Sequence, residues 1–235
     1  MTSLAPLERA RRVLVLVVAL LLALVVGMFL GRSLPSAPAG NSVDVGFARD
    51  MAIHHGQAVD MAYTALRTAP SPEVRQLAVD MASTQGNQAG RLQQLLISWD
   101  QPLAGGSATM AWMAGTELHA RHVVQQQQGR VMPGMATAAE LARLRSQTGQ
   151  AFEVDFLQLV LRHHRGGIEM AEFGAEHATT DDVRDLARAI ATSQQGESQL
   201  LTDLLAARGA QPLPVDDAAE GQGAPGGQGA PGGGA

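Results

Sequence analysis

A helical segment with a His-His pair occurs twice in this chain, and one constant offset separates the two copies. The first copy, FARDMAIHHGQAVDMA, covers residues 47–62, and the second, FLQLVLRHHRGGIEMA, covers residues 156–171. The offset of 109 continues without a gap through Val74/Val183, Arg75/Arg184, Leu77/Leu186, Gln85/Gln194, Leu92/Leu201 and Leu96/Leu205. An unbroken offset is typical of an internal repeat, so we expect two copies of one helical hairpin.

Four long helical patterns fill the two copies. They are predicted at about residues 43–68, 72–99, 150–177 and 181–208. Ser71, before Pro72, is expected to cap the second helix, and Thr179 and Thr180 the fourth. Two hairpins with short connections predict an all-α four-helix bundle over residues 43–208, with repeats at 43–99 and 150–208.

A crossover, residues 100–149, joins the hairpins and is less regular. It contains a candidate short helix at about residues 117–128 and the sequence Met132-Pro133-Gly134-Met135. Thr137 and Glu140 form a capping-box pattern that opens another short helix. A connection of this length leaves the relative direction of the two hairpins open.

An uncharged apolar run covers residues 13–30, long enough for a transmembrane helix. Arg9, Arg11 and Arg12 precede it and Arg32 follows it, which predicts a cytoplasmic N-terminus at residues 1–12 and an extracytoplasmic C-terminal domain. A signal peptide cleaved near Ala37-Pro38-Ala39 is the alternative. Residues 31–42 are expected to be a linker, and the Gly/Pro/Ala-rich residues 209–235 a disordered tail.

Composition limits the partners and the chemistry. The chain has no cysteine, so a soft metal site must use Met and His. Without the residues flanking the apolar run, 13 arginines face 21 acidic residues, a formal charge of −8 that argues against nucleic-acid binding. No acidic residue lies three positions before any histidine, and no HExxH, GxSxG or P-loop motif occurs. We therefore expect no enzyme.

Residues at matching positions of the two copies share one helical stripe. They are Phe47, Met51, His54, Ala58 and Met61 in the first copy and Phe156, Val160, His163, Gly167 and Met170 in the second. Because the stripe is apolar, His54 and His163 should face the bundle interior, where an imidazole needs a partner. That partner is a metal ion, with His55 and His164 beside it, or else a carboxylate, a carbonyl or the opposite histidine.

Two clusters in the crossover are further candidates for metal binding. His119 and His122, with Glu117 nearby, have a spacing that places both rings on one helical face. Met132 and Met135, with Met110 and Met113, carry thioethers that suit Cu(I). Exposed surface histidines and hydrophobic anchoring of the crossover explain these clusters equally well.

The blocks DMAIHHGQAVDMA, MPGM and FLQLVLRHHRGGIEMA resemble those of the family called domain of unknown function 305, over about residues 43–208. The resemblance implies a ferritin-like four-helix bundle and, for some members, extracytoplasmic copper binding. At the matching positions it implies metal ligands at His54, His55, Met61, His163, His164, Met170, Met132 and Met135. This chain departs from the pattern at Val160, which stands where the first copy has Met51.

Together these observations predict a membrane-tethered extracytoplasmic protein that binds copper for sequestration or handover. A structural or interaction module whose histidines are only hydrogen-bonded is the first alternative, and a metal-dependent redox enzyme is the second. Since a protonated imidazole cannot bind a metal, copper affinity should fall as the pH drops below about 6.5, the pKa of an unperturbed ring.

Overall fold

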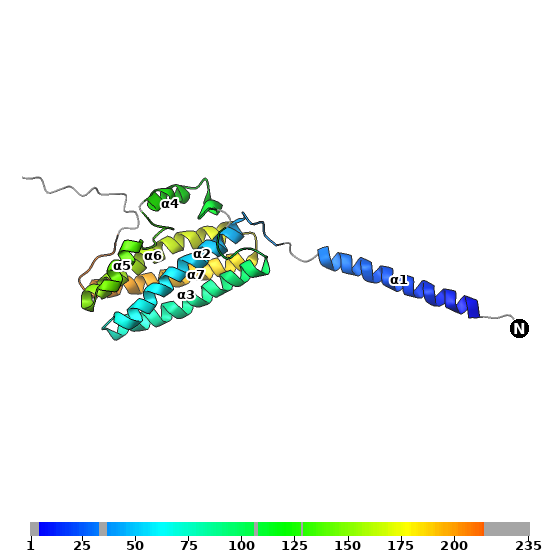
Figure 1. Ribbon diagram of the computed structural model, residues 1–235, viewed down its shortest axis with the longest axis horizontal. Coiled ribbons are helices and arrows are strands. Elements are labelled where there is room, and N and C mark those ends of the chain that lie inside the picture. The colour runs from blue at the N-terminus through cyan, green and yellow to red at the C-terminus, as the bar shows by residue number, and fades with distance from the viewer. Residues whose placement is uncertain (1–4, 33–36, 106–107, 128, 214–235) are drawn as a thin grey trace, which may run out of the picture. The chain divides into compact units, whose positions relative to one another are not determined.

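The computed structural model describes residues 5–32, 37–105, 108–127 and 129–213, and these residues form helices and connections without a strand (Figure 1). The elements are α1 (Ala5–Arg32), α2 (Val43–Thr68), α3 (Pro72–Ser98), the 3-10 turn η1 (Ala111–Met113), α4 (Glu117–Gln127), α5 (Ala138–Ser146), α6 (Gly149–His177) and α7 (Asp181–Ala207). The all-α class is confirmed. Most of the expected tail, from residue 214, and residues 33–36 of the expected linker lie outside the described residues.

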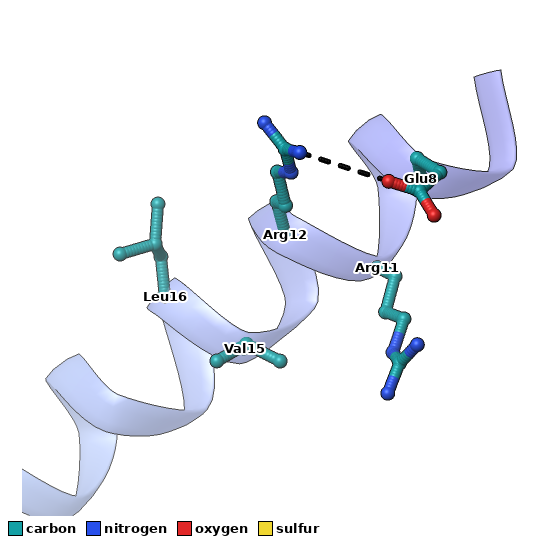
Figure 2. A pocket seen from close by; sticks show the side chains of 5 residues that line it. All are labelled: Glu8, Arg11, Arg12, Val15 and Leu16. Carbon is teal, nitrogen blue, oxygen red and sulfur yellow. Dashed lines mark ion pairs between the residues drawn. The ribbon is translucent and has the colours of Figure 1, made fainter. Parts of the chain in front are cut away.

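The chain divides into two compact units, Met1–Ala37 and Pro38–Ala235. The first unit contains α1, whose 21-residue window Glu8–Met28 has a mean hydropathy of 2.5 and is long and apolar enough to cross a membrane. Figure 2 shows the polar start of this window, where Arg12 pairs with Glu8 at 3.6 Å one turn before the apolar Val15 and Leu16. An N-terminal signal sequence meets the same criterion of length and hydropathy.

The second unit is a four-helix bundle built from the hairpins α2–α3 and α6–α7, with α2 packed against α6 between them (Figure 1). The contacts of two glycines give the direction of this central pair. A Cβ at Gly174 would lie 2.7 Å from the Phe47 ring, and a Cβ at Gly167 would lie 3.0 Å from the His54 ring. Since the α6 residue number falls as the α2 residue number rises, α2 and α6 run antiparallel.

Each hairpin caps the second helix of the other one. The carboxylate of Asp44 on α2 accepts hydrogen bonds of 2.7–3.0 Å from the amides and hydroxyls of Thr179 and Thr180. Glu153 on α6 accepts one of 2.8 Å from the amide of Ser71 and another from its hydroxyl. Ser71 and Thr180 occupy the predicted N-cap positions, but their hydroxyls donate to a carboxylate of the opposite hairpin and do not accept from the amides of their own helix. Asp44 and Glu153 are themselves 109 positions apart.

The crossover is fixed to α6 through a buried ion pair. The Arg162 guanidinium, 1% exposed, donates to both carboxylate oxygens of Glu140 at 2.7 and 2.8 Å. The predicted capping box of Thr137 and Glu140 is confirmed, and it begins α5. Burial raises the pKa of Glu140, but the bonds from Arg162 and Thr137 outweigh it and hold the pKa at about 2.

The loop that precedes α5 lies directly on α6. A Cβ at Gly166 would lie only 2.2 Å from the carbonyl oxygen of Pro133 and 2.7 Å from the amide nitrogen of Gly134. Gly134 itself has φ +72°, a left-handed conformation that favours glycine. This backbone-on-backbone contact brings the Pro133 carbonyl into the centre of the bundle, beside the paired histidines.

Candidate metal centre

His54 and His163 meet at the middle of the bundle, where α2 crosses α6. Both side chains are 0% exposed, and their ring centroids lie 3.8 Å apart with 34° between the ring planes. The approach is possible because Gly167 leaves no side chain between the helices. The prediction that both rings face the interior is confirmed.

The hydrogen bonds of these two rings fix their tautomers. His54 donates from Nε2 to the carbonyl oxygen of Pro133 at 3.1 Å, and His163 donates from Nε2 to the carbonyl oxygen of His54 at 3.0 Å. A carbonyl only accepts, so each Nε2 carries the hydrogen and each Nδ1 carries the lone pair. Pro133 as a partner could not be predicted, because it reaches His54 through a tertiary contact of the crossover.

The neighbouring histidines have partners on the outer helices. His55 donates from Nε2 to Oε1 of Gln88 on α3, and His164 donates from Nε2 to Oε2 of Glu197 on α7, both at 2.7 Å. The Gln88 amide also donates to Oγ of Ser193, which orients its oxygen toward the ring. Gln88 and Glu197 were not predicted as partners, although they are polar and 109 positions apart in the sequence.

All four rings therefore keep an Nδ1 lone pair inside the protein. The Nδ1 atoms of His54, His55, His163 and His164 are buried and have no hydrogen-bond partner. The side-chain amides of Gln85 and Gln194, again 109 positions apart, are buried and unpartnered as well. Histidines that bind metals have this arrangement, with one ring nitrogen free for the ion and the other held by a carbonyl or carboxylate.

Burial keeps the central imidazoles neutral. It lowers the pKa of His54 to about 3, with a further contribution from the neighbouring His55, and it lowers the pKa of His55 to about 4. Burial and the adjacent rings also hold the pKa of His163 well below 6.5. The pH of about 6.5 predicted for the loss of copper affinity is therefore too high. Rings with these pKa values stay neutral down to about pH 4 in the folded protein.

The same pKa values predict acid sensitivity of the copper-free fold. The unfolded chain protonates these rings near pH 6.5, whereas folded His54 and His55 do so at about 3 and about 4. Below pH 6.5 the unfolded state thus binds more protons, and the folded state loses about 1.4 kcal/mol per pH unit for each ring. The two rings should cost about 4 kcal/mol at pH 5.

Thermal unfolding followed by circular dichroism between pH 7 and pH 5 measures this loss. Carboxylates with a lowered pKa, such as Glu140, lose their contribution only below about pH 4.5 and do not act in this window. A melting temperature that stays constant from pH 7 to pH 5 would contradict the assignment of neutral, unprotonated rings.

Six buried methionines belong to one core cluster at one end of the bundle. They are Met51, Met110, Met113, Met132, Met135 and Met170. Because Phe47 lies against Gly174 and His54 against Gly167, Met51 is level with Met170 on the antiparallel helices. Met61 belongs to the other core cluster, with Val160. The structure thus does not bring Met61 and Met170 together, and it makes one end of the bundle richer in thioethers.

The remaining predicted residues lie on α4. His122 is 1% exposed, and neither of its ring nitrogens has a partner, whereas His119 is half-buried and donates from Nδ1 to the carbonyl oxygen of Met110 at 3.0 Å. Their ring centroids are 6.1 Å apart. Glu117 is exposed at the start of the helix.

The donor set limits which metal fits the bundle centre. Among the described residues, no three or more His, Cys, Asp or Glu side chains are grouped to hold a metal ion. The unpartnered donor atoms at the bundle centre are imidazole nitrogens. The carboxylate of Glu197 accepts from Nε2 of His164, on the other side of that ring from the free Nδ1. A soft ion that takes few ligands, drawn from imidazoles and nearby thioethers, fits this composition better than a hard ion does.

The sequence and the fold match known proteins. The model of the family described as "Domain of unknown function (DUF305)" matches residues 44–205. A DUF305 protein from Streptomyces coelicolor is 42% identical with a TM-score of 0.65, over 74% of this chain and 98% of that one. A DUF305 fragment from Deinococcus radiodurans is 30% identical with a TM-score of 0.59, over 74% and 99%.

More distant similarity extends to a protein named CopM. Its structure in the Cu(I)-bound form is 20% identical to this chain with a TM-score of 0.53, over 70% of this chain and 96% of CopM. This likeness shows a shared fold. Comparison with curated proteins gives no match.

Proposed function

This chain belongs to the DUF305 family, and from that membership and the chemistry of its core we propose that it is a membrane-anchored extracytoplasmic protein that binds copper. Its role in this proposal is sequestration or handover of the ion and not catalysis. The helix α1 provides the anchor, and the two hairpins are repeats of one ancestral unit that together enclose the site.

One observation carries the proposal, namely the four unpartnered Nδ1 lone pairs inside the bundle. A buried polar atom without a partner costs free energy, about 1–3 kcal/mol. An ion held between His54 and His163, whose rings lie 3.8 Å apart, would satisfy the two central ones. The hydrogen bonds from Nε2 to Pro133, His54, Gln88 and Glu197 then hold each ring in the orientation and tautomer that an ion requires.

Copper is favoured over other ions by the ligand types. The cluster that contains Met51 and Met170 supplies thioethers at one side of the central rings, and the chain has no thiolate. Thioether and imidazole together suit Cu(I), whereas manganese prefers carboxylates and the iron sites of helical bundles add carboxylates to their histidines. CopM, which shares the fold at about 20% identity, has structures in Cu(I)-bound, Cu(II)-bound and Ag-bound forms, which supports the same choice here.

A second candidate function rests on a different observation. The Nε2 atom of each core histidine already has a protein partner, so the rings can serve as hydrogen-bonding links between the four helices. In this alternative the protein is a structural or interaction module, and the Nδ1 lone pairs are tolerated at a cost in stability.

Competition for metal tests the proposed function. The full-length protein in detergent is dialysed against equal concentrations of Cu(I), under a reductant, Zn(II) and Fe(II), and the retained metals are measured. We expect copper to be retained in preference to zinc and iron, because neutral imidazoles and thioethers are soft ligands. Tighter retention of zinc or iron than of copper would contradict the proposal, and so would a protein that retains no metal.

A further inference from the structure

We propose that α4 carries a second metal site, formed by His119 and His122, that takes a divalent ion of the Cu(II) type through imidazole nitrogens alone. The site lies on the crossover and uses none of the residues assigned to the bundle centre. Its presence can therefore be tested independently of the proposed Cu(I) site.

The helix positions the two rings for one ion. His119 and His122 are three residues apart on α4, so both side chains leave the same face of the helix. Their centroids are 6.1 Å apart with 49° between the ring planes. Two rings that bind one ion through nitrogens about 2.0 Å from it place their centroids up to about 6.4 Å apart. The observed separation lies just inside this upper limit.

The free nitrogens of the two rings are the second indication. His122 is 1% exposed, yet neither Nδ1 nor Nε2 has a hydrogen-bond partner. His119 donates from Nδ1 to the carbonyl oxygen of Met110, which leaves the lone pair on Nε2. One ring is thus oriented by a carbonyl as a metal ligand requires, and the other is buried with two atoms unsatisfied.

The surroundings suit a divalent cation. Arg121 lies on the same helix, but its guanidinium pairs with Glu169 of α6 at 3.3 Å, which compensates its charge. Since His119 is half-buried, an ion can reach the pair from solvent while water completes its coordination.

The chemistry of the two sites differs. Imidazoles without thioethers suit Cu(II) better than Cu(I), because Cu(I) prefers the softer sulfur ligands. The protein would therefore hold one oxidation state of copper on the crossover helix and the other in the bundle centre. The crossover that contains α4 also contains Pro133, whose carbonyl accepts the hydrogen bond from His54 at the bundle centre.

Electron paramagnetic resonance of the full-length protein loaded with one equivalent of Cu(II) tests this site. We expect nitrogen hyperfine structure from two imidazoles in the wild type and its loss in His119→Asn. His177→Asn is the matched control, because His177 is also a helical histidine with Nδ1 on a carbonyl, and it should keep the signal. His122→Asn, checked for folding by circular dichroism, should lose the signal as well.

The variant His54→Ala/His163→Ala separates the two sites. It should keep the two-imidazole Cu(II) spectrum even though Cu(I) binding at the bundle centre is lost. The proposal is overturned if His119→Asn keeps the wild-type spectrum, if the double variant loses it, or if the wild type binds no Cu(II). Failure of Cu(I) binding in the wild type contradicts the proposed function and leaves this result unchanged.

Discussion

Gly166→Ala should lower the free energy of unfolding by about 3 kcal/mol, near the upper end for an overpacked core position. The new methyl group would lie 2.2 Å from the carbonyl oxygen and 2.4 Å from the carbonyl carbon of Pro133. Both atoms belong to the backbone, so no side-chain rotation relieves the clash. The loop must move away from α6, and the hydrogen bond from His54 to Pro133 is then lost.

Urea unfolding of full-length Gly166→Ala in detergent measures this effect, with Gly90→Ala as the control. Gly90 is exposed on α3, and a Cβ there would meet no atom within 4 Å. Because alanine favours helix over glycine, the control should gain about 0.5–1 kcal/mol. We expect the free energy of unfolding to fall in Gly166→Ala and to rise in Gly90→Ala. If it changes in the same direction in both variants, the loop contact is not the reason that position 166 requires glycine.

The helices of the bundle were predictable from local signals. The expected bounds of the four long helices agree with α2, α3, α6 and α7 to within one residue. Pro72 marks the start of α3, and Thr180 with Asp181 and Asp182 marks the start of α7. The apolar stripe also placed His54 and His163 in the interior correctly, since the side a helix buries follows from its periodicity.

The contacts between distant segments were not predictable in this way. The carbonyl of Pro133 and the antiparallel direction of α2 and α6 depend on how the crossover packs, and no local pattern encodes that. The direction decides that Met51, and not Met61, is level with Met170. By contrast, the partners Gln88 and Glu197 could have been found, because a polar position that recurs at the repeat offset indicates a shared role.

His54→Ala/His163→Ala should abolish the effect of copper on thermal stability. Removing both rings deletes the two central Nδ1 lone pairs, which are the proposed ligands of the ion. A ligand present at about 1000 times its Kd stabilises the folded state by about 4 kcal/mol, which raises the melting temperature of a domain of this size by about 10 °C. The double variant should show almost none of this rise, whereas exposed His177→Ala should show all of it.

The hydrogen-bonding alternative predicts another pattern for the same proteins. Without a metal role, the double variant loses stability because it leaves a cavity and an unpaired Pro133 carbonyl. Copper would then change the melting temperature of neither protein. The loss of stability in the copper-free double variant is common to both accounts, so only the response to copper separates them.

The most direct test of copper binding in the bundle core is therefore the melting temperature of the full-length wild type with and without Cu(I), beside that of His54→Ala/His163→Ala. We expect a rise of about 10 °C for the wild type at saturating copper and a negligible change for the double variant. A wild type whose melting temperature is indifferent to copper, or a double variant that responds as the wild type does, would contradict it.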